Sequence, residues 1–292
     1  MDSTDLIRQV RTIELKTRRL VDGLFAGLYL SSFKGRGIEF DEVREYVPGD
    51  DVRAIDWNVT ARTGRPFIKN YVEERELTLM LMVDISGSTG FGTTGRFKRQ
   101  LEAELSATLA FSALRNNDRV GLALFSDRVE RFIPPLKGRN HVLRIVRELL
   151  LAQPSRRSTD LGAALDYVNQ VLKRQALLVI ISDFRTGDYA RPLRISARRH
   201  DVVAVQIEDP GERLLPSVGL LRLQDAETGH EVILDLRNKR VREQLQSSAE
   251  SLRKAHQELF RSLGVDAVTL STDQPYVEPL AALFENRIRR RR

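Results

Sequence analysis

An apolar run that ends in oxygen-bearing side chains is the feature that most constrains the fold of this chain. It lies within Leu77 to Ser88, whose sequence is LTLMLMVDISGS. A run of this kind, with charged residues before it and small polar residues after it, predicts a strand buried on both faces. Asp84, Ser86 and Ser88 follow at alternate positions in the turn beyond that strand. Because ligands of open α/β sheets bind beyond the carboxyl ends of the strands, this turn is a candidate site for a hard cation.

The composition is that of a globular protein. The chain has 292 residues, of which 41% are hydrophobic and 30% are charged. It contains no cysteine, which excludes disulfides, thiolate metal sites and a cysteine nucleophile. The N-terminal sequence MDSTDLIRQV has no basic segment leading into an apolar core, so we expect no secretory signal. The apolar stretch from Leu20 to Phe33 is short and contains Asp22, so we expect no membrane span.

Strand and helix patterns alternate from residue 77 onward. The predicted strands are 77–83, 120–125, 129–133, 176–181, 202–207 and 265–270. The predicted helices are 97–116, 139–151, 159–174, 189–199, 240–263 and 279–288. This alternation predicts an α/β fold with a doubly wound, mostly parallel sheet and helices on both faces. The brief link before 129–133 favours an antiparallel hairpin at one edge.

Two segments depart from the alternation. The N-terminal extension, residues 1–76, is expected to contain a helix from residue 3 to about 30 and a strand over 67–72. Residues 216–238 are expected to form an inserted hairpin, because two apolar stretches flank the turn Asp225 to Gly229. The expected division is therefore an extension at 1–76, a main domain at 77–288 and a basic tail at 289–292.

The charge balance is basic. The formal net charge is +7, and Arg289 to Arg292 contribute four of the positive charges. Two interpretations stay open for this run: a solvated, frayed tail, or a weak attraction for nucleic acid or an acidic partner. The sequence shows no basic surface interleaved with aromatic residues, the pattern typical of single-strand binders.

Three loops of the predicted fold carry oxygen ligands. They are Asp84 to Ser88, Ser158 to Asp160, and Ser182-Asp183. In a parallel sheet such loops can lie at the same edge. A carboxylate, a few hydroxyls and bound waters match what Mg²⁺ prefers. Each loop alone is also compatible with a helix cap or a strand end, so the prediction depends on the three together.

The string DISGS at 84–88, with Thr159 and Asp183, resembles the metal-ion-dependent adhesion site of von Willebrand factor A domains. The resemblance covers about Leu77 to Arg287. It implies that the first loop supplies three ligands, the second loop one, and the third loop an aspartate that often acts through water. The implied metal ligands are Asp84, Ser86, Ser88, Thr159 and Asp183. The third loop departs from the pattern, since Phe184 stands where many A domains have glycine.

The stretch Glu39 to Arg62, EFDEVREYVPGDDVRAIDWNVTAR, resembles the signature of the DUF58 family. That family consists of bacterial proteins with an A-type domain, commonly encoded beside MoxR-type AAA+ ATPases. The resemblance implies a MoxR-type ATPase as partner, and a cytoplasmic member of the family. The candidate partner-binding residues are Arg44, Tyr46, Asp50, Asp51, Arg53, Asp56 and Trp57. The alternative is that Trp57 and Tyr46 lie in the core, with Arg and Asp paired to fix turns.

The expected function is a non-catalytic protein-interaction module that depends on Mg²⁺ or Mn²⁺. An acidic side chain of a client protein would complete the metal shell, and the ATPase would act on that client. A metal-dependent hydrolase or phosphotransferase is the alternative from another class. Against it, Ser86 occupies the position two residues after Asp84, and no phosphate loop or G-x-S-x-G elbow is present. The histidines lack ligand spacing; they are His141, His200, His230 and His256.

Overall fold

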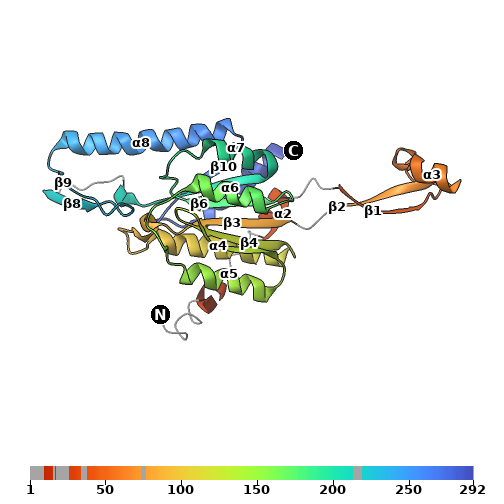
Figure 1. The fold of residues 1–292 in the computed structure, drawn as a ribbon, viewed down its shortest axis with the longest axis horizontal. Helices are drawn as coiled ribbons and strands as arrows, with labels where there is room; N and C mark the ends of the chain where they lie inside the picture. Colours follow the sequence, from red (N-terminus) through yellow and green to blue (C-terminus); the bar gives the residue numbers. More distant parts are fainter. Residues whose placement is uncertain are drawn as a thin grey trace. The chain divides into compact units, whose positions relative to one another are not determined.

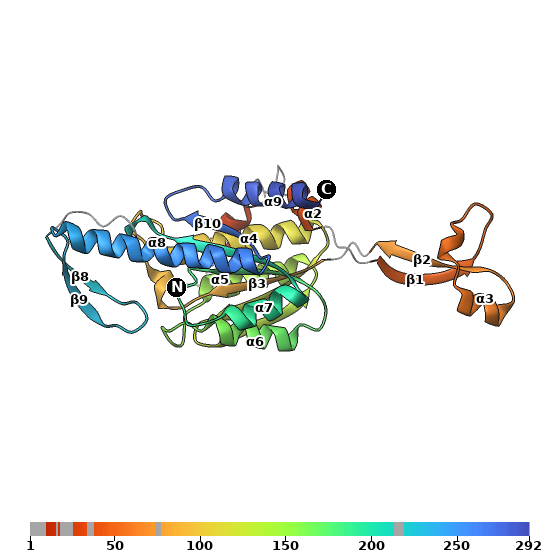
Figure 2. The same ribbon diagram turned by 90° about the horizontal axis from the view of Figure 1, so that it is seen from above.

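The chain forms two compact units. The structure, a computed structural model, describes residues 10–15, 17, 26–33, 38–73, 77–212 and 219–291. The larger unit comprises Met1–Ser32 together with Thr78–Arg292, and the smaller unit is Phe33–Leu77. Figures 1 and 2 show the described elements of both units.

A six-stranded sheet forms the centre of the larger unit. Its strands are β3 (Thr78–Asp84), β4 (Arg119–Phe125), β5 (Val129–Leu136), β6 (Leu177–Ser182), β7 (Asp201–Glu208) and β10 (Asp266–Ser271). Their order across the sheet is β10-β7-β6-β3-β4-β5. All neighbouring strands are parallel except β4 and β5, which pair antiparallel at one edge. The predicted doubly wound sheet and its antiparallel edge are confirmed.

Helices cover both faces of this sheet. They are α4 (Lys98–Arg115), α5 (Arg139–Leu151), α6 (Leu161–Val171), α7 (Ala190–Arg199), α8 (Lys239–Ser262) and α9 (Val277–Arg291). Figure 1 shows α4 and α5 on one face, and α6, α7 and α8 on the other. Helix α9 packs on β10, and the Tyr276 hydroxyl just before it lies 3.0 Å from the Thr108 hydroxyl of α4. This placement follows from the chain order, because right-handed crossovers in opposite directions from β3 put helices on opposite faces.

The apolar sequence of β3 follows from its position in the core. Leu79, Met80, Leu81 and Met82 are completely buried because the strand has neighbours on both edges and helices on both faces. Parallel strands covered on both faces are apolar at consecutive positions rather than at alternate ones. After Thr78, its first residue, the strand therefore presents no polar side chain until Asp84, its last residue.

The N-terminal segment groups with the larger unit, which differs from the expected extension over 1–76. Helix α2 (Ala26–Phe33) packs on α9, where the Tyr29 ring meets the Phe284 ring edge-on at 6.5 Å. The Ser32 hydroxyl donates a hydrogen bond of 2.9 Å to the Phe284 carbonyl. Residues 10–15 are also helical, as predicted for 3–30. Residues 3–9, 16 and 18–25 of that predicted helix lie outside the described residues.

The smaller unit is built on one antiparallel pair. Strand β1 (Ile38–Glu45) pairs with β2 (Phe67–Glu73), with a register shift between Phe40 and Glu42. The 3₁₀ turn η2 (Val52–Ala54) and the short helix α3 (Trp57–Thr63) lie between the two strands. The predicted strand over 67–72 is confirmed. Strand β1 was not predicted from the sequence.

The remaining segments fit the expectations in part. Strands β8 (Leu220–Gln224) and β9 (Glu231–Asp235) form the predicted hairpin. The C-terminal arginines continue helix α9 as far as Arg291, and Arg290 forms an ion pair of 2.9 Å with Asp266. Arg289 and Arg290 are exposed, so the run is solvated as one interpretation expects, but it is helical rather than frayed. In the part of the chain that the structure describes, no helix is long and apolar enough to cross a membrane.

Candidate functional site

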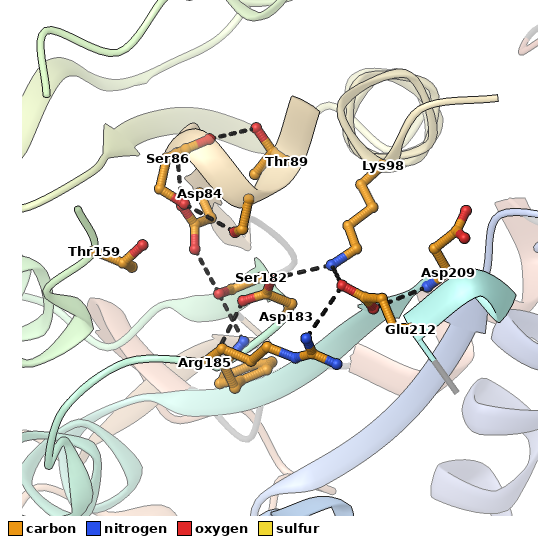
Figure 3. A network of polar contacts seen from close by, with 12 residues as sticks. Asp84, Ser86, Thr89, Lys98, Thr159, Ser182, Asp183, Arg185, Asp209 and Glu212 are labelled. Carbon is orange, nitrogen blue, oxygen red and sulfur yellow. Dashed lines mark hydrogen bonds and ion pairs between the residues drawn. The ribbon is translucent and has the colours of Figure 1, made fainter. Parts of the chain in front are cut away.

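Asp84, the last residue of β3, is the centre of the candidate site, which Figure 3 shows from close by. Its side chain is completely buried. Carboxylate Oδ1 accepts a hydrogen bond of 2.9 Å from the Ser86 amide, and Oδ2 accepts one of 2.7 Å from the Ser182 hydroxyl. Burial, followed by the charge of Asp183, raises the pKa of Asp84 to about 7. The loops after β3 and β6 are thus joined through this carboxylate.

The two serines of the first loop present their hydroxyls side by side. Ser86 Oγ and Ser88 Oγ lie 3.2 Å apart. The loop turns into the 3₁₀ segment η3 (Gly87–Gly90), whose start is fixed by the Thr89 hydroxyl bonded to the Ser86 carbonyl at 2.8 Å. Ser86 stands at the N-terminal cap position of η3 but makes no capping hydrogen bond with its side chain. The alternative of a helix cap therefore does not account for the Ser86 hydroxyl.

The third loop follows β6, which is the neighbour of β3 in the sheet. Chain order reverses between these strands, since β4 and β5 extend the sheet on one side, and β7 and β10 on the other. Ligands bind at such a switch point in doubly wound folds. Asp183 is 3% exposed there, and its Oδ1 accepts a hydrogen bond of 3.0 Å from the Arg185 amide.

The second loop brings Thr159 to the same edge. Its hydroxyl donates a hydrogen bond of 2.6 Å to Glu227 Oε1, and its carbonyl accepts one of 2.9 Å from the Thr186 hydroxyl. The cap of α6 is the neighbouring residue Asp160, whose carboxylate accepts from the Ala163 amide at 2.8 Å. The Thr159 hydroxyl is therefore not used as a cap. All three predicted loops lie at one edge of the sheet.

Lys98, at the start of α4, is a buried cation that the sequence analysis missed. Its ammonium lies 3.1 Å from Asp183 Oδ2 and 2.5 Å from Glu212 Oε1, and its side chain is 0% exposed. Arg185 reaches the same Glu212 carboxylate at 3.4 Å. Burial alone would lower the pKa of Lys98, yet the charges of Asp183 and Glu212 raise it. The same ammonium lowers the pKa of Asp183 against the effect of burial.

Glu102, one turn further along α4, adds a buried carboxyl group to the site. It is 1% exposed, and neither carboxyl oxygen has a hydrogen-bond partner among the described residues. Burial, and then the charges of Asp84 and Asp183, raise its pKa well above the ordinary value. Within the described part of the chain, Lys98 pairs with Asp183 and Glu212, and no cation pairs with Asp84. The cluster is therefore short of positive charge.

A small divalent cation fits these donors. In octahedral Mg²⁺ coordination, with ligand distances near 2.1 Å, adjacent oxygens lie about 3 Å apart. The 3.2 Å between Ser86 Oγ and Ser88 Oγ matches that spacing. Among the residues that the structure describes, no cation compensates the buried carboxyl of Asp84 beside them. A site made only of carboxylates and imidazoles is not formed, since the described residues contain no group of three or more such side chains in metal-binding arrangement.

Two of the site's charged residues, Lys98 and Glu102, could have been sought by one signal. Lys98 and Glu102 are spaced by four residues and lie on the same face as Leu101 and Leu105, which are fully buried. A charged pair on the apolar stripe of a helix indicates buried partners elsewhere in the fold. Glu227 gives no comparable signal, because its position at a hairpin turn does not reveal what the turn contacts.

The candidate partner-binding residues of the smaller unit are mostly engaged in local structure. The Asp50 carboxylate accepts hydrogen bonds from both terminal guanidinium nitrogens of Arg44, at 2.8 and 2.7 Å, and these bonds lower the pKa of Asp50. Asp51 caps η2 through the Arg53 amide, and Asp56 caps α3. Asp50 is thus paired with an arginine, as in the alternative interpretation, whereas Asp51 and Asp56 accept from backbone amides.

The same interpretation is wrong for Trp57. Its side chain is 70% exposed, and Val52 and Val47 nearby in sequence are 60% and 56% exposed. Tyr46 is half-buried, and its amide donates a hydrogen bond of 2.9 Å to the Pro66 carbonyl. Arg53 is exposed. Trp57 stays out of the core because α3 is a short surface helix with no buried side chain.

Comparison with known proteins places the chain in a family. Residues 42–255 match the family described as "Protein of unknown function DUF58". An uncharacterized protein of Mycobacterium tuberculosis is 33% identical over 294 residues, which covers 99% of this chain and 92% of the relative. The uncharacterized protein YeaD of Bacillus subtilis is 25% identical over 167 residues, covering 57% of this chain and 40% of YeaD.

Solved structures with similar folds include the conserved hypothetical protein BatB from Bacteroides thetaiotaomicron. It has a TM-score of 0.49 at 13% identity, covering 73% of this chain and 99% of BatB. The SpRpn10 VWA domain has a TM-score of 0.39 at 13% identity, covering 72% of this chain and 95% of that domain. The fold assignment itself rests on the strand order described above. By the family match and the full-length relative, the chain belongs to the DUF58 family.

Proposed function

We propose that this chain is a non-catalytic protein-interaction module whose binding depends on Mg²⁺ or Mn²⁺. The observation that carries the proposal is the pair of hydroxyls of Ser86 and Ser88, 3.2 Å apart beside the buried carboxyl of Asp84, which no cation of the described residues balances. Ser86, Ser88 and Thr159 would hold the ion directly. Asp84 and Asp183 would contribute negative charge, either as direct ligands of the ion or through bound water.

The chemistry of the donors supports binding rather than catalysis. Neutral hydroxyls leave a divalent ion with much of its positive charge, so an acidic side chain of a client protein is a favourable further ligand. Ser86 stands two residues after Asp84, where a carboxylate base would serve phosphoryl transfer. The described side chains around Asp84 are held by hydrogen bonds within the site, which suits a rigid recognition surface.

The test is a calorimetric titration of Mg²⁺ into the wild type and the Asp84→Ala variant. We expect saturable binding to the wild type and none to the variant. Asp84→Asn, which keeps the size of the side chain, separates loss of charge from loss of structure. Asp50→Ala is the matched control, because it removes an aspartate whose partners are Arg44 and Val47. Equal binding to the wild type and Asp84→Ala, or no binding to the wild type, would contradict the proposed metal site.

We also propose a MoxR-type AAA+ ATPase as the partner that acts on the bound client. Membership of the DUF58 family supports this partner, and the exposed Trp57 and Val52 of the smaller unit give it an apolar contact surface. The test is a binding titration of a purified MoxR-type ATPase with the wild type, Trp57→Ala and Asp84→Ala. Variants are preferable to chelation here, because the ATPase needs Mg²⁺ itself. Weaker binding of Trp57→Ala alone would assign the ATPase to the smaller unit and leave the metal site for the client.

A further inference from the structure

The tip of the β8–β9 hairpin lies on the candidate metal site, although the two are far apart in sequence. Glu227 Oε1 accepts the 2.6 Å hydrogen bond of the Thr159 hydroxyl across 68 residues. The backbone of the tip also approaches the first loop, because a Cβ on Gly87 would collide with the carbonyl oxygen of Ala226. Two of the three metal loops are thus in contact with one hairpin turn. Glycine at position 87 is what permits this close approach.

The turn is shaped so that Glu227 is presented to the site. Asp225 Oδ1 accepts hydrogen bonds from the amides of Glu227 and Thr228, at 2.8 and 2.9 Å. The Gly229 amide bonds to the Asp225 carbonyl at 2.9 Å, and Gly229 adopts a positive φ of 73°. These bonds fix the course of the turn without using the Glu227 side chain. The carboxylate of Glu227 is therefore available for Thr159.

The contact is arranged so that it can be released. The hairpin is a two-stranded sheet of its own, with Leu220 and Ile233 69% and 66% exposed. Isolated two-stranded hairpins are marginally stable. The tip is joined to the second loop through the carboxylate of Glu227. The Thr159 hydroxyl is the described hydrogen-bond partner that holds it.

We propose that Glu227 is an internal acidic ligand that covers the metal site until a partner's carboxylate displaces it. This inference rests on the proposed function, since it assigns to the chain's own carboxylate the position proposed for a client. The partner chemistry follows from the occupant: a protein segment that presents Asp or Glu from a projecting turn. Binding of such a partner then frees the β8–β9 hairpin.

The first experiment needs no metal and measures whether Glu227 holds the hairpin tip in place. The chain has no cysteine, so an introduced pair forms a disulfide without competition. Arg157 and Ala226 both lie against Gly87, which makes Arg157→Cys with Ala226→Cys a suitable trap. We expect the cross-link to form several-fold more slowly when Glu227→Ala is added. The control is Glu231→Ala, which removes a carboxylate of the same hairpin that pairs with Arg222 at 3.5 Å. Equal rates in all backgrounds would overturn the proposal.

The second experiment uses Mn²⁺ as the probe and acetate as the competing carboxylate. Water-proton relaxation reports how many waters the bound Mn²⁺ retains, and acetate lowers that number. An internal ligand acts at an effective concentration in the millimolar range or above, so we expect acetate to bind Glu227→Ala about tenfold more tightly than the wild type. Glu231→Ala is again the control and should match the wild type. Identical acetate binding to Glu227→Ala and the wild type would overturn the proposal.

The two experiments separate failure of this inference from failure of the metal site. If the wild type binds no Mn²⁺, the proposed function fails, and the cross-linking rates alone decide whether Glu227 tethers the hairpin. If Mn²⁺ binds but Glu227→Ala changes neither rate nor acetate affinity, the metal site stands and the covering role of Glu227 is rejected.

Discussion

Aspartates of the two units stand in opposite settings. Asp84 in the larger unit is completely buried, and burial together with Asp183 raises its pKa to about 7. Asp50 in the smaller unit is half-buried, and the guanidinium of Arg44 lowers its pKa. Asp84 has no cation paired with it in the described part of the chain, while Asp50 accepts two hydrogen bonds from a single arginine. The difference teaches that a dense group of acidic residues marks a ligand site only where the fold leaves its charge unbalanced.

The largest expected effect comes from removing Lys98, a cation buried between two carboxylates of the larger unit. Lys98→Met leaves Asp183 and Glu212 buried without its charge. Loss of one partner from a buried ion pair costs about 3–5 kcal/mol of the free energy of unfolding. Arg44→Met in the smaller unit removes a pair whose arginine is 40% exposed, and we expect a much smaller loss of stability because solvent screens the pair.

Each unit has its own probe for this comparison. Circular dichroism reports mainly the helices of the larger unit, and the fluorescence of Trp57, the only tryptophan, reports the smaller one. Mg²⁺ should raise the free energy of unfolding of Lys98→Met by more than that of the wild type, because in the variant a cation at the site replaces the lost charge. A cost for Lys98→Met no greater than that for Arg44→Met would break the contrast between the units.

The aspartates of the smaller unit should act on local stability. Asp56→Ala removes the side chain that accepts from the amides of Asn58 and Val59 at the start of α3. Loss of such a cap costs about 1 kcal/mol. Urea unfolding followed by Trp57 fluorescence measures it, with Asn58→Ala as a control in the same helix. Unchanged Mg²⁺ binding by Asp56→Ala is also expected, and a change would contradict the assignment of Asp56 to local structure.

The contrast between buried and exposed groups extends to histidine. His200 is 4% exposed, neither ring nitrogen has a partner among the described residues, and burial, followed by the charge of Arg199, lowers its pKa. The unfolded chain takes up the proton near pH 6.5 while the folded chain resists it, so stability falls as the pH drops below about 6.5. Thermal unfolding between pH 8 and 5 should show a smaller loss for His200→Asn than for the wild type. His230→Asn, at an exposed hairpin position, should behave like the wild type.

The sequence predicts the parts of the site that depend on short-range pattern. Strand β3 and its terminal Asp84 follow from one continuous apolar run, and the strand order of the sheet places the loops after β3 and β6 together. Lys98 and Glu227 could not be assigned in this way. Their roles depend on Glu212 and Thr159, at separations of 114 and 68 residues, which only the folded chain brings near.

Trp57 was ambiguous for a different reason. A large aromatic side chain in a segment with alternating charges is compatible with either core or surface, because burial depends on what packs against the segment. The sequence of α3 alone offers no second apolar face to decide between them. The indole is in fact the most exposed large hydrophobic side chain of the described residues of α3 and η2, at 70% against 60% for Val52.

The smallest expected effect on stability is that of Trp57→Ala. Exposed substitutions away from caps and ion pairs usually change the free energy of unfolding by about 0.5 kcal/mol or less. Amide exchange of β1 and β2 should therefore be unchanged in Trp57→Ala. Ile68→Ala, at a residue of β2 that is 5% exposed, should accelerate that exchange strongly, because it leaves a cavity in a small core.

Quenching of the wild-type protein tests the same point without a substitution. Iodide reaches a tryptophan in water but not one in a core, so Trp57 should be quenched nearly as well as free tryptophan. A blue-shifted, unquenched emission would return Trp57 to the core and remove the apolar contact surface proposed for the ATPase. If the emission of the free protein is quenched by iodide and becomes protected when a MoxR-type ATPase is added, the exposed indole of Trp57 contacts the ATPase. The smaller unit would then bind the ATPase through its apolar surface, and the larger unit would bind the client through the unbalanced charge of the metal site.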